Sequence, residues 1–187
     1  MRFSADKSGF TLVELLVAIT IIAILGVAMY VPYQRYERIA RVRVSAEHVE
    51  QTVTEARTLA RSGYMMPKTD TNANLGVLFE RGSSSVRILA YPHGTDTGSI
   101  SLAGTGVAVI RTVALAANVS LTDLPSGVDS LLLYFTAPRA EVTALDLDGV
   151  VPTALPAGTG AVVVGFSGAL APVDEPGGLL RSVVIRH

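Results

Sequence analysis

Cysteine is absent from this 187-residue chain. Its absence excludes disulfide bonds, thiolate catalysis and zinc sites with cysteine ligands, and it leaves the compartment open because export permits disulfides without requiring them. The charge balance is also close to zero, since 15 Lys and Arg face 16 Asp and Glu. Bulk charge therefore argues against a nucleic-acid-binding protein, and length and composition indicate one modest domain beside the apolar segment described next.

Charged side chains are missing from one long stretch. Between Leu15 and Gln34 there is no Asp, Glu, Lys, Arg or His. About 20 apolar residues, rising 1.5 Å each, allow a helix to cross the hydrocarbon core of a membrane. Glu14 directly precedes this stretch, and a carboxylate at mid-bilayer costs roughly 2.5 to 3.5 kcal/mol, less near the interface. We therefore expect Glu14 to have a partner or a function.

A short polar leader with Arg2 and Lys7 precedes Gly9, Phe10, Glu14 and the apolar run. In this combination the N-terminal residues closely resemble the prepilin leader and cleavage motif of type IV pilins and type II secretion pseudopilins. The resemblance implies cleavage between Gly9 and Phe10 by a prepilin peptidase and N-methylation of the new Phe10 amine. It also implies that Glu14, fifth in the mature chain, pairs with an N-terminal amine during filament assembly.

The same resemblance implies a location and a set of partners. The protein would pass once through the inner membrane, with an extracytoplasmic globular domain, and would then enter a pilus or pseudopilus. Its partners would be the prepilin peptidase, other pilin or pseudopilin subunits, an inner-membrane assembly platform and the lipid bilayer. Four arginines after the span, at positions 35, 38, 41 and 43, would by the positive-inside rule favour a cytoplasmic domain. We follow the resemblance, because the rule is a bias and arginines can contact headgroups or neighbouring subunits.

Other interpretations account for part of the N-terminal segment. Thr11 and Glu14 have the spacing of a capping box, which satisfies free N–H groups at a helix start but leaves Gly9 and the leader unexplained. A secretory signal would have a shorter, uncharged apolar region followed by a small-x-small cleavage site. A membrane-anchored β binding module that never polymerises is the alternative from a different functional class.

A helix is expected to resume after Pro32, which removes a backbone donor and can kink a helix. One apolar stripe follows in steps of three and four, formed by Ile39, Val42, Ala46, Val49, Val53, Ala56 and Ala60. Either a coiled-coil seam or packing on a sheet could use it. The stripe is short, rich in alanine and followed by strand-like sequence, which favours a sheet. Gly63 is predicted to be the C-cap.

From Met65 onward the sequence consists of short segments rich in strand-forming residues, separated by turn residues. The predicted strands are 75–81, 85–91, 106–114, 130–136, 160–166 and 180–186. The predicted fold class is α+β: a long N-terminal helix, membrane-spanning in its first half and amphipathic in its second, packed on a mainly antiparallel sheet. The expected domains are a leader at 1–9, a transmembrane or filament-core helix at 10–32, its amphipathic continuation at 33–63 and a β-rich pilin-like domain at 64–187.

Two further segments, 49–91 and 161–186, carry a looser resemblance. The first reads VEQTVTEARTLARSG, then a variable turn and LGVLFERGSSSVRILAY; the second has a strand ending at Phe166, Gly168, a loop and a last strand. Both are similar to H-type minor pseudopilins of type II secretion and to T-type minor pilins, which implies a minor subunit. Many pilins staple a C-terminal loop with a disulfide, and this chain departs from that pattern.

Catalytic chemistry is not indicated. His48, His93 and His187 lack the carboxylate spacing of zinc or hydrolase sites and are interpreted as solvated side chains. The Gly-Thr-Gly sequences at 104–106 and 158–160 precede strands and lack the Lys-Ser/Thr of a phosphate-binding loop, so they are predicted turns. No nucleophile, base and oxyanion arrangement can be assembled, and the prediction is that the protein is not an enzyme.

Calcium is the weak cofactor candidate. Asp146 and Asp148 alternate before a turn glycine, and with Glu141, Asp174 or Glu175 they could supply oxygens to Ca²⁺, which takes six to eight. The twelve-residue calcium loop is absent, and an exposed turn explains the same residues.

DNA is the weak partner candidate. Some T-type minor pilins bind DNA through a basic C-terminal element, and Arg181 and Arg186 lie at the corresponding end. The two arginines are five residues apart, so in a regular strand they face opposite sides. Residues 62–187 also hold seven Lys and Arg against ten Asp and Glu, or −3, which opposes a phosphate-tracking surface.

Overall fold

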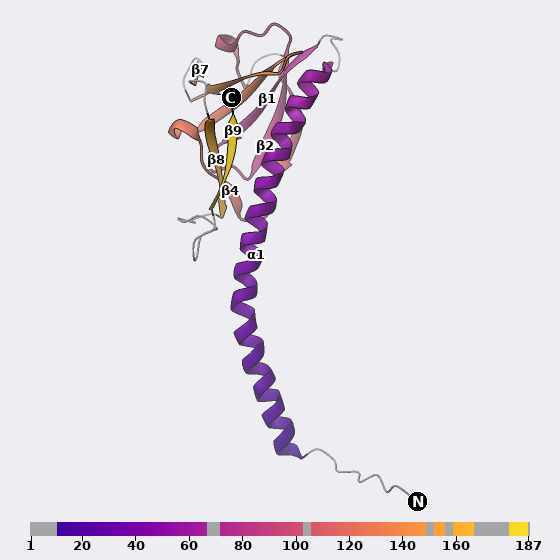
Figure 1. Ribbon diagram of the computed structural model, residues 1–187, viewed down its shortest axis with the longest axis vertical. Coiled ribbons are helices and arrows are strands. Elements are labelled where there is room, and N and C mark those ends of the chain that lie inside the picture. The colour runs from indigo at the N-terminus through magenta and orange to yellow at the C-terminus, as the bar shows by residue number, and fades with distance from the viewer. Residues whose placement is uncertain are drawn as a thin grey trace, which may run out of the picture. The chain divides into compact units, whose positions relative to one another are not determined.

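The computed structural model describes residues 11–66, 72–102, 106–148, 152–155, 159–166 and 180–186. The chain divides into two units, Met1–Arg38 and Ile39–His187. Helix α1, Leu12–Ser62, contributes residues to both (Figure 1). All named strands belong to the second unit.

Helix α1 is 51 residues long and includes Pro32. It ends in a Schellman motif, because Gly63 has a positive φ of 73°. The N–H of Gly63 bonds to the carbonyl of Ala60 at 3.4 Å, and the N–H of Tyr64 bonds to that of Leu59 at 3.2 Å. These bonds satisfy carbonyls that the helix end would otherwise leave unpaired. The predicted C-cap at Gly63 is confirmed.

Six strands form the larger sheet, in the order β3-β2-β1-β5-β6-β7 with every pair antiparallel. Their bounds are β1 Ala73–Glu80, β2 Ser85–Pro92, β3 Ala108–Ala114, β5 Ser130–Thr136, β6 Glu141–Asp146 and β7 Thr153–Ala154. Short 3₁₀ turns lie between strands at Thr97–Ser99 and Pro125–Gly127. The central strand β1 is flanked by β2, which follows it directly, and by β5, which arrives later in the chain.

The smaller sheet has three antiparallel strands in the order β4-β8-β9. Their bounds are β4 Val119–Asp123, β8 Thr159–Phe166 and β9 Leu180–Arg186. Val162 and Val164 of β8 and Val183 of β9 are buried, whereas Val184 is 62% exposed. This alternation is the pattern of strands with one covered face.

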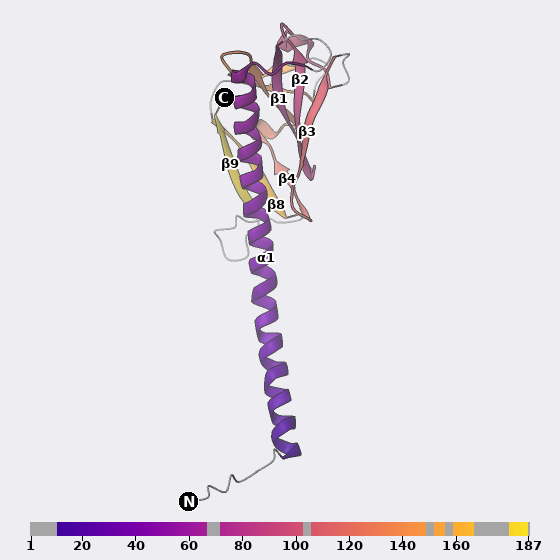
Figure 2. The ribbon, with the colours of Figure 1, turned by 90° about the vertical axis from the view of Figure 1, so that its right-hand side faces the viewer.

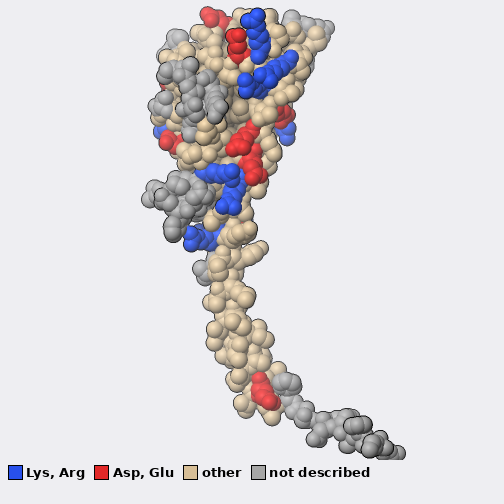
Figure 3. All heavy atoms as spheres, in the orientation of Figure 1, with Lys and Arg blue, Asp and Glu red and all other residues tan. Residues whose placement is uncertain are grey.

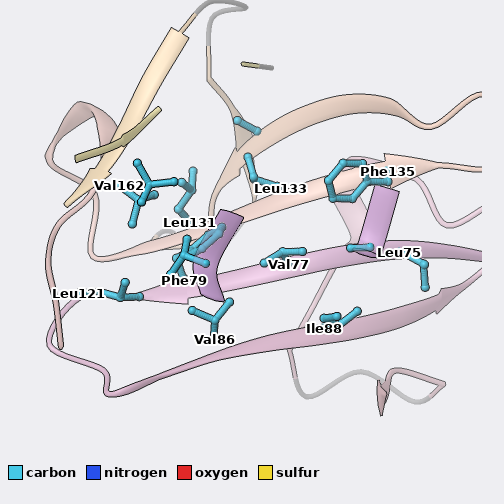
Figure 4. Close-up of a cluster of buried hydrophobic side chains, with 14 of the residues drawn as sticks. Leu75, Val77, Phe79, Val86, Ile88, Leu121, Leu131, Leu133, Phe135 and Val162 are labelled. Carbon is cyan, nitrogen blue, oxygen red and sulfur yellow. The ribbon is translucent and has the colours of Figure 1, made fainter. Parts of the chain in front are cut away.

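The main core lies between the second half of α1, one face of the larger sheet and the smaller sheet. The helix contributes small side chains that are fully buried, namely Val42, Ala46, Val49, Ala56 and Ala60. Facing them are large side chains from β1 and β5, including Leu75, Phe79, Leu133 and Phe135, with Val162 from β8 (Figure 4). Alanines on the helix let it approach the sheet closely. The apolar stripe therefore packs on a sheet, as predicted. Figure 2 shows α1 and the labelled strands of the second unit from another side.

A second core covers the opposite face of the larger sheet. Leu78, Leu89, Leu132 and Leu145 are buried there with Ile100 from the segment between β2 and β3. Because β1, β2 and β5 are buried on both faces, their sequences are almost continuously apolar instead of alternating.

Two tyrosines share this second core. Tyr91 and Tyr134 pack edge to face with ring centroids 5.6 Å apart. The Tyr134 hydroxyl accepts from Asn74 Nδ2 at 2.7 Å and donates to the carbonyl of Thr95 at 3.1 Å, whereas the Tyr91 hydroxyl has no hydrogen-bond partner within the described ranges. Burial raises the pKa of both phenols above the ordinary tyrosine value, so both are neutral at physiological pH.

The α+β class and the antiparallel pairing are confirmed, and all six predicted strands are present within two residues of their expected bounds. The sequence prediction missed three strands, β4, β6 and β7. The first has the sequence VSLTD, the second is EVTALD, and the third has two residues. Each is short and partly polar, so local pattern does not distinguish it from a loop. The partner of β4 is β8, which is distant in sequence, whereas β6 and β7 each pair with the strand before them. The predicted turn at 176–178 lies outside the described residues.

Gly76 offers a test of the close packing on the second core. A Cβ at this position would lie 2.7 Å from Leu132 Cδ1 and 3.0 Å from Tyr91 Cε2. We expect Gly76→Ala to lower the free energy of unfolding by about 1 to 3 kcal/mol, because extra atoms force neighbouring side chains to move. Denaturant unfolding of the full chain in detergent measures this. The control Gly98→Ala, whose nearest atom would be 3.9 Å away, should change stability by less than about 0.5 kcal/mol; equal losses would contradict the packing.

Candidate processing and assembly site

Thr11 and Glu14 form a reciprocal capping box at the first turn of α1. Glu14 Oε2 accepts hydrogen bonds from the Thr11 backbone N–H at 2.9 Å and from the Thr11 hydroxyl at 2.8 Å. Thr11 Oγ1 in turn accepts from the Glu14 N–H at 3.2 Å. The first backbone bond of the helix joins the Leu15 N–H to the Thr11 carbonyl at 3.2 Å. The cap satisfies donors that a helix start leaves without intrahelical partners.

The cap leaves part of the Glu14 carboxylate available. Both accepted bonds end on Oε2, and Oε1 accepts none from any residue in the described ranges. An ionised carboxylate has two acceptor oxygens with about four lone-pair sites. Capping and pairing with an amine are therefore compatible roles for one side chain, and the cap does not replace the assembly role that the resemblance implies.

Gly9 and Phe10, the predicted cleavage and methylation residues, lie outside the described residues. Their roles stay predictions. The described helix begins two residues after Phe10, at Leu12, with Thr11 as its cap.

The first half of α1 exposes large apolar side chains around its circumference. Their exposed fractions run from 48% at Val17 to 79% at Leu12. The most apolar 18-residue window has a mean hydropathy of 2.7 and none of it is buried within the protein. Contiguous exposed apolar surface of this extent marks a membrane or protein contact. Within the described ranges α1 is the one helix long and apolar enough to span a bilayer.

The hydroxyl of Thr20 in this segment is satisfied by the helix itself. The Thr20 hydroxyl donates to the carbonyl of Leu16 at 2.8 Å. A hydroxyl without a partner would be costly in lipid or in a packed helix bundle, and this bond removes that cost in either setting.

The calcium candidates are engaged in hydrogen bonds to the backbone. Asp148 accepts from the N–H groups of Asp129 and of Ser130, the latter at 2.6 Å, and Asp146 Oδ1 accepts from the Asp148 N–H at 2.9 Å. These bonds tie the end of β6 to the start of β5. No group of three or more potential ligands is found in the described part of the chain. Asp174 and Glu175 lie outside it, so calcium binding stays a prediction.

One ion pair between helix and sheet was not predicted. Arg111 Nη1 on β3 lies 2.8 and 3.0 Å from the two carboxylate oxygens of Glu55 on α1. Beside it His48, interpreted from sequence as solvated, is half-buried and lines a cavity of about 160 Å³ together with Glu55 and Arg111. Residues 55 and 111 are far apart in the chain, and no local pattern connects them.

The remaining candidates do not converge. Arg181 of β9 is half-buried and lies opposite Val164 in the strand register, whereas Arg186 lies opposite Thr159 at the other end of the strand. His93 is exposed in the turn after β2, and His187 lies outside the described residues. Arg181 and Arg186 are therefore separated along β9, and DNA binding stays a prediction.

Comparison with known proteins identifies the N-terminal segment. Residues 4–30 match the family model described as the prokaryotic N-terminal methylation motif. No match was found among curated proteins or among solved structures. The matched range contains Gly9, Phe10, Glu14 and most of the exposed apolar segment.

The motif and the helix together define a class: a chain with a prokaryotic N-terminal methylation motif on a helix that is long and apolar enough to span a membrane. The match confirms the resemblance of the N-terminal segment to the type IV pilin and pseudopilin family, and the motif implies processing by a prepilin peptidase. The looser resemblance to the H-type and T-type minor subunits lies outside the matched range and stays a prediction.

A substitution of Asp148 distinguishes a structural role of its carboxylate from a role in metal binding. We expect Asp148→Ala to lower the free energy of unfolding by about 1 kcal/mol, because two backbone N–H groups lose an acceptor in a partly solvated site. The loss should be the same in EGTA and in millimolar calcium, as measured by denaturant unfolding. A loss seen only with calcium would instead establish the metal site.

Proposed function

We propose that this protein is a structural, non-enzymatic subunit, of the minor type, of a type IV pilus or type II secretion pseudopilus. Prepilin peptidase would cleave it between Gly9 and Phe10 and methylate the new amine. The assembly platform of the inner membrane would then add it to a filament of other pilin or pseudopilin subunits.

The main support for this proposal is that two features fall on the same segment. The match to the methylation motif, at residues 4–30, falls on the same segment whose apolar side chains are left exposed. A membrane anchor alone would account for the exposure but not for the motif. A soluble secreted domain would account for neither.

The apolar segment suits two environments in succession. Lipid and packed helices are both apolar, so the residues that hold the subunit in the bilayer can later pack against neighbouring helices. Glu14 fits the second environment, because a carboxylate and an amine attract strongly once both are removed from water together. Neither group is stable there alone.

The proposed organisation follows the same logic. Residues 1–9 form the cytoplasmic leader, 10–32 the spanning or filament-core helix, 33–63 its amphipathic continuation and 64–187 the extracytoplasmic β-rich domain. That domain would face outward and carry the partner specificity of the subunit. The alternatives are an anchored β binding module that never polymerises and a DNA-binding minor pilin.

Processing is tested first by N-terminal mass spectrometry of the membrane-expressed chain with and without a prepilin peptidase. We expect the chain to begin at methylated Phe10 only when the peptidase is present. Replacing Gly9 with a bulky residue should retain the nine-residue leader. A leader that stays attached in the unsubstituted chain would favour the anchored module.

Two substitutions separate the cap from the charge at the helix start. Glu14→Gln keeps a capping box, since Gln also serves at this position, but removes the carboxylate. Thr11→Ala removes the cap hydroxyl and keeps the carboxylate. We expect Glu14→Gln and Glu14→Ala to be cleaved normally yet to be depleted about tenfold or more in sheared filaments, because breaking a buried ion pair costs about 3 to 5 kcal/mol.

Thr11→Ala is the matched control and should reach filaments at close to the normal level, since losing an exposed cap costs about 1 kcal/mol. If Glu14→Gln assembles normally while Thr11→Ala does not, Glu14 acts as a cap and its proposed pairing is wrong.

A further inference from the structure

The last residues of the first unit, 30–38, differ from the apolar segment before them. Three tyrosines in this stretch, Tyr30, Tyr33 and Tyr36, are 61%, 66% and 72% exposed. Arg35 and Arg38 lie among them in the sequence and are also exposed. We call these five side chains the interfacial band. Figure 3 shows α1 as uncharged surface over a long stretch, with an acidic side chain at one end and basic side chains at the other.

The interfacial band surrounds the helix. Successive residues of an α-helix are turned by about 100°, so the three tyrosines, each three residues from the next, cover one side of α1. Arg35 and Arg38 are also three residues apart, and they fall on the opposite side. A contact with one neighbouring element uses a single face of a helix, as the apolar stripe of the second unit does. A band around the circumference suits a medium that surrounds the helix.

The position of the band along α1 matches the thickness of a bilayer. Glu14 and Arg35 bound the stretch without ionisable side chains, and the helix rises about 32 Å between them. The hydrocarbon core of a bilayer is about 30 Å thick. With Glu14 at one membrane surface, Tyr33 therefore lies near the other surface, and the guanidinium group of Arg35 lies in the headgroup layer.

The side chains of the band suit that layer chemically. Tyrosine combines an apolar ring with a polar hydroxyl, and tyrosines are enriched where a membrane meets water. A guanidinium group matches the geometry of a phosphate and can donate two hydrogen bonds to it. Arg35 forms no ion pair with a described residue, whereas Glu37 and Arg38 each have an interaction within the chain. Arg35 therefore offers a positive charge that the described chain does not use.

We propose that the interfacial band binds the headgroups of anionic phospholipids, such as phosphatidylglycerol, at the extracytoplasmic surface of the membrane. The tyrosine rings lie at the boundary of the acyl chains, and Arg35 and Arg38 bind lipid phosphates. The band fixes the depth of the helix and enriches anionic lipid around it. It also gives the arginines a partner on the side of the membrane where the positive-inside rule does not favour them. This step rests on the proposed function, because it requires the single-span anchor.

A fluorescent reporter tests the depth of the band. The chain contains no tryptophan, so Tyr33→Trp introduces a single one, and tryptophan is enriched at the same membrane level as tyrosine. The full-length variant is placed in vesicles whose lipids carry bromine, which quenches tryptophan, either near the headgroup or at the end of the acyl chain. We expect stronger quenching by bromine near the headgroup. Stronger quenching from the bilayer centre would overturn the proposed depth.

The same reporter measures lipid preference. Brominated phosphatidylglycerol is compared with brominated phosphatidylcholine at equal fractions of the vesicle lipid. We expect phosphatidylglycerol to associate with the band more strongly by about threefold or more, because a basic side chain near a membrane surface attracts anionic lipid. The preference should fall in about 0.5 M salt, which screens exposed charges. Equal association of the two lipids at low salt would overturn the proposal.

Charge removal then identifies the residues responsible. Arg35→Ser together with Arg38→Ser, in the chain with Tyr33→Trp, should make the association of the two lipids nearly equal. Arg57→Ser is the matched control, since Arg57 is an exposed arginine further along α1 that forms no ion pair with a described residue. It should leave the preference unchanged. A preference that survives the double change, or that Arg57→Ser abolishes, would refute the assignment to the band.

The outcome is separable from that of the proposed function. Quenching is measured on the unprocessed chain in vesicles and requires neither a prepilin peptidase nor a filament. Normal processing at Gly9 without a lipid preference removes the band alone. A leader that the peptidase does not remove contradicts the pilin assignment and leaves the quenching result unchanged.

Discussion

Water cannot solvate the apolar half of α1, and the rest of the chain is arranged around that constraint. The segment exposes large apolar side chains around its circumference, so it must lie in lipid or against other helices. The Thr20 hydroxyl bonds to its own backbone, and the Glu14 carboxylate is placed at the very start, where the helix N-terminus can use it. The buried core residues of the second unit that the structure describes begin at Val42.

One continuous helix, α1, contributes to both units. Up to Arg38 the helix belongs to the first unit, and from Ile39 its small side chains are buried under two sheets. Small residues at the contact allow close approach of helix and sheet, and the large residues come from the strands. The exposed face of the same helical segment carries mostly charged residues, among them Glu47, Glu50 and Arg57.

Much of this could be predicted from the sequence because the relevant signals are local. The charge-free run, the stripe of Val42 and Ala46, the terminating Gly63 and the apolar strands each depend on neighbours a few residues away. The short strand β4, the contact of Glu55 with Arg111 and the bonds from Asp148 to residues 129 and 130 depend on partners far along the chain. Helix periodicity and strand alternation carry no information about such pairs. At the candidate site the sequence pattern indicated Gly9, Phe10 and Glu14. Only the structure shows that Oε2 of Glu14 forms the cap while Oε1 accepts no hydrogen bond from a described residue.

The order of the strands bears on how the protein is made. The first strand of the smaller sheet, β4, has no partner in that sheet until β8, and β8 is paired again only by β9. Val183 of β9 also fills the common core. A chain that emerges from the ribosome N-terminus first therefore lacks a closed core until its last strand has been synthesised.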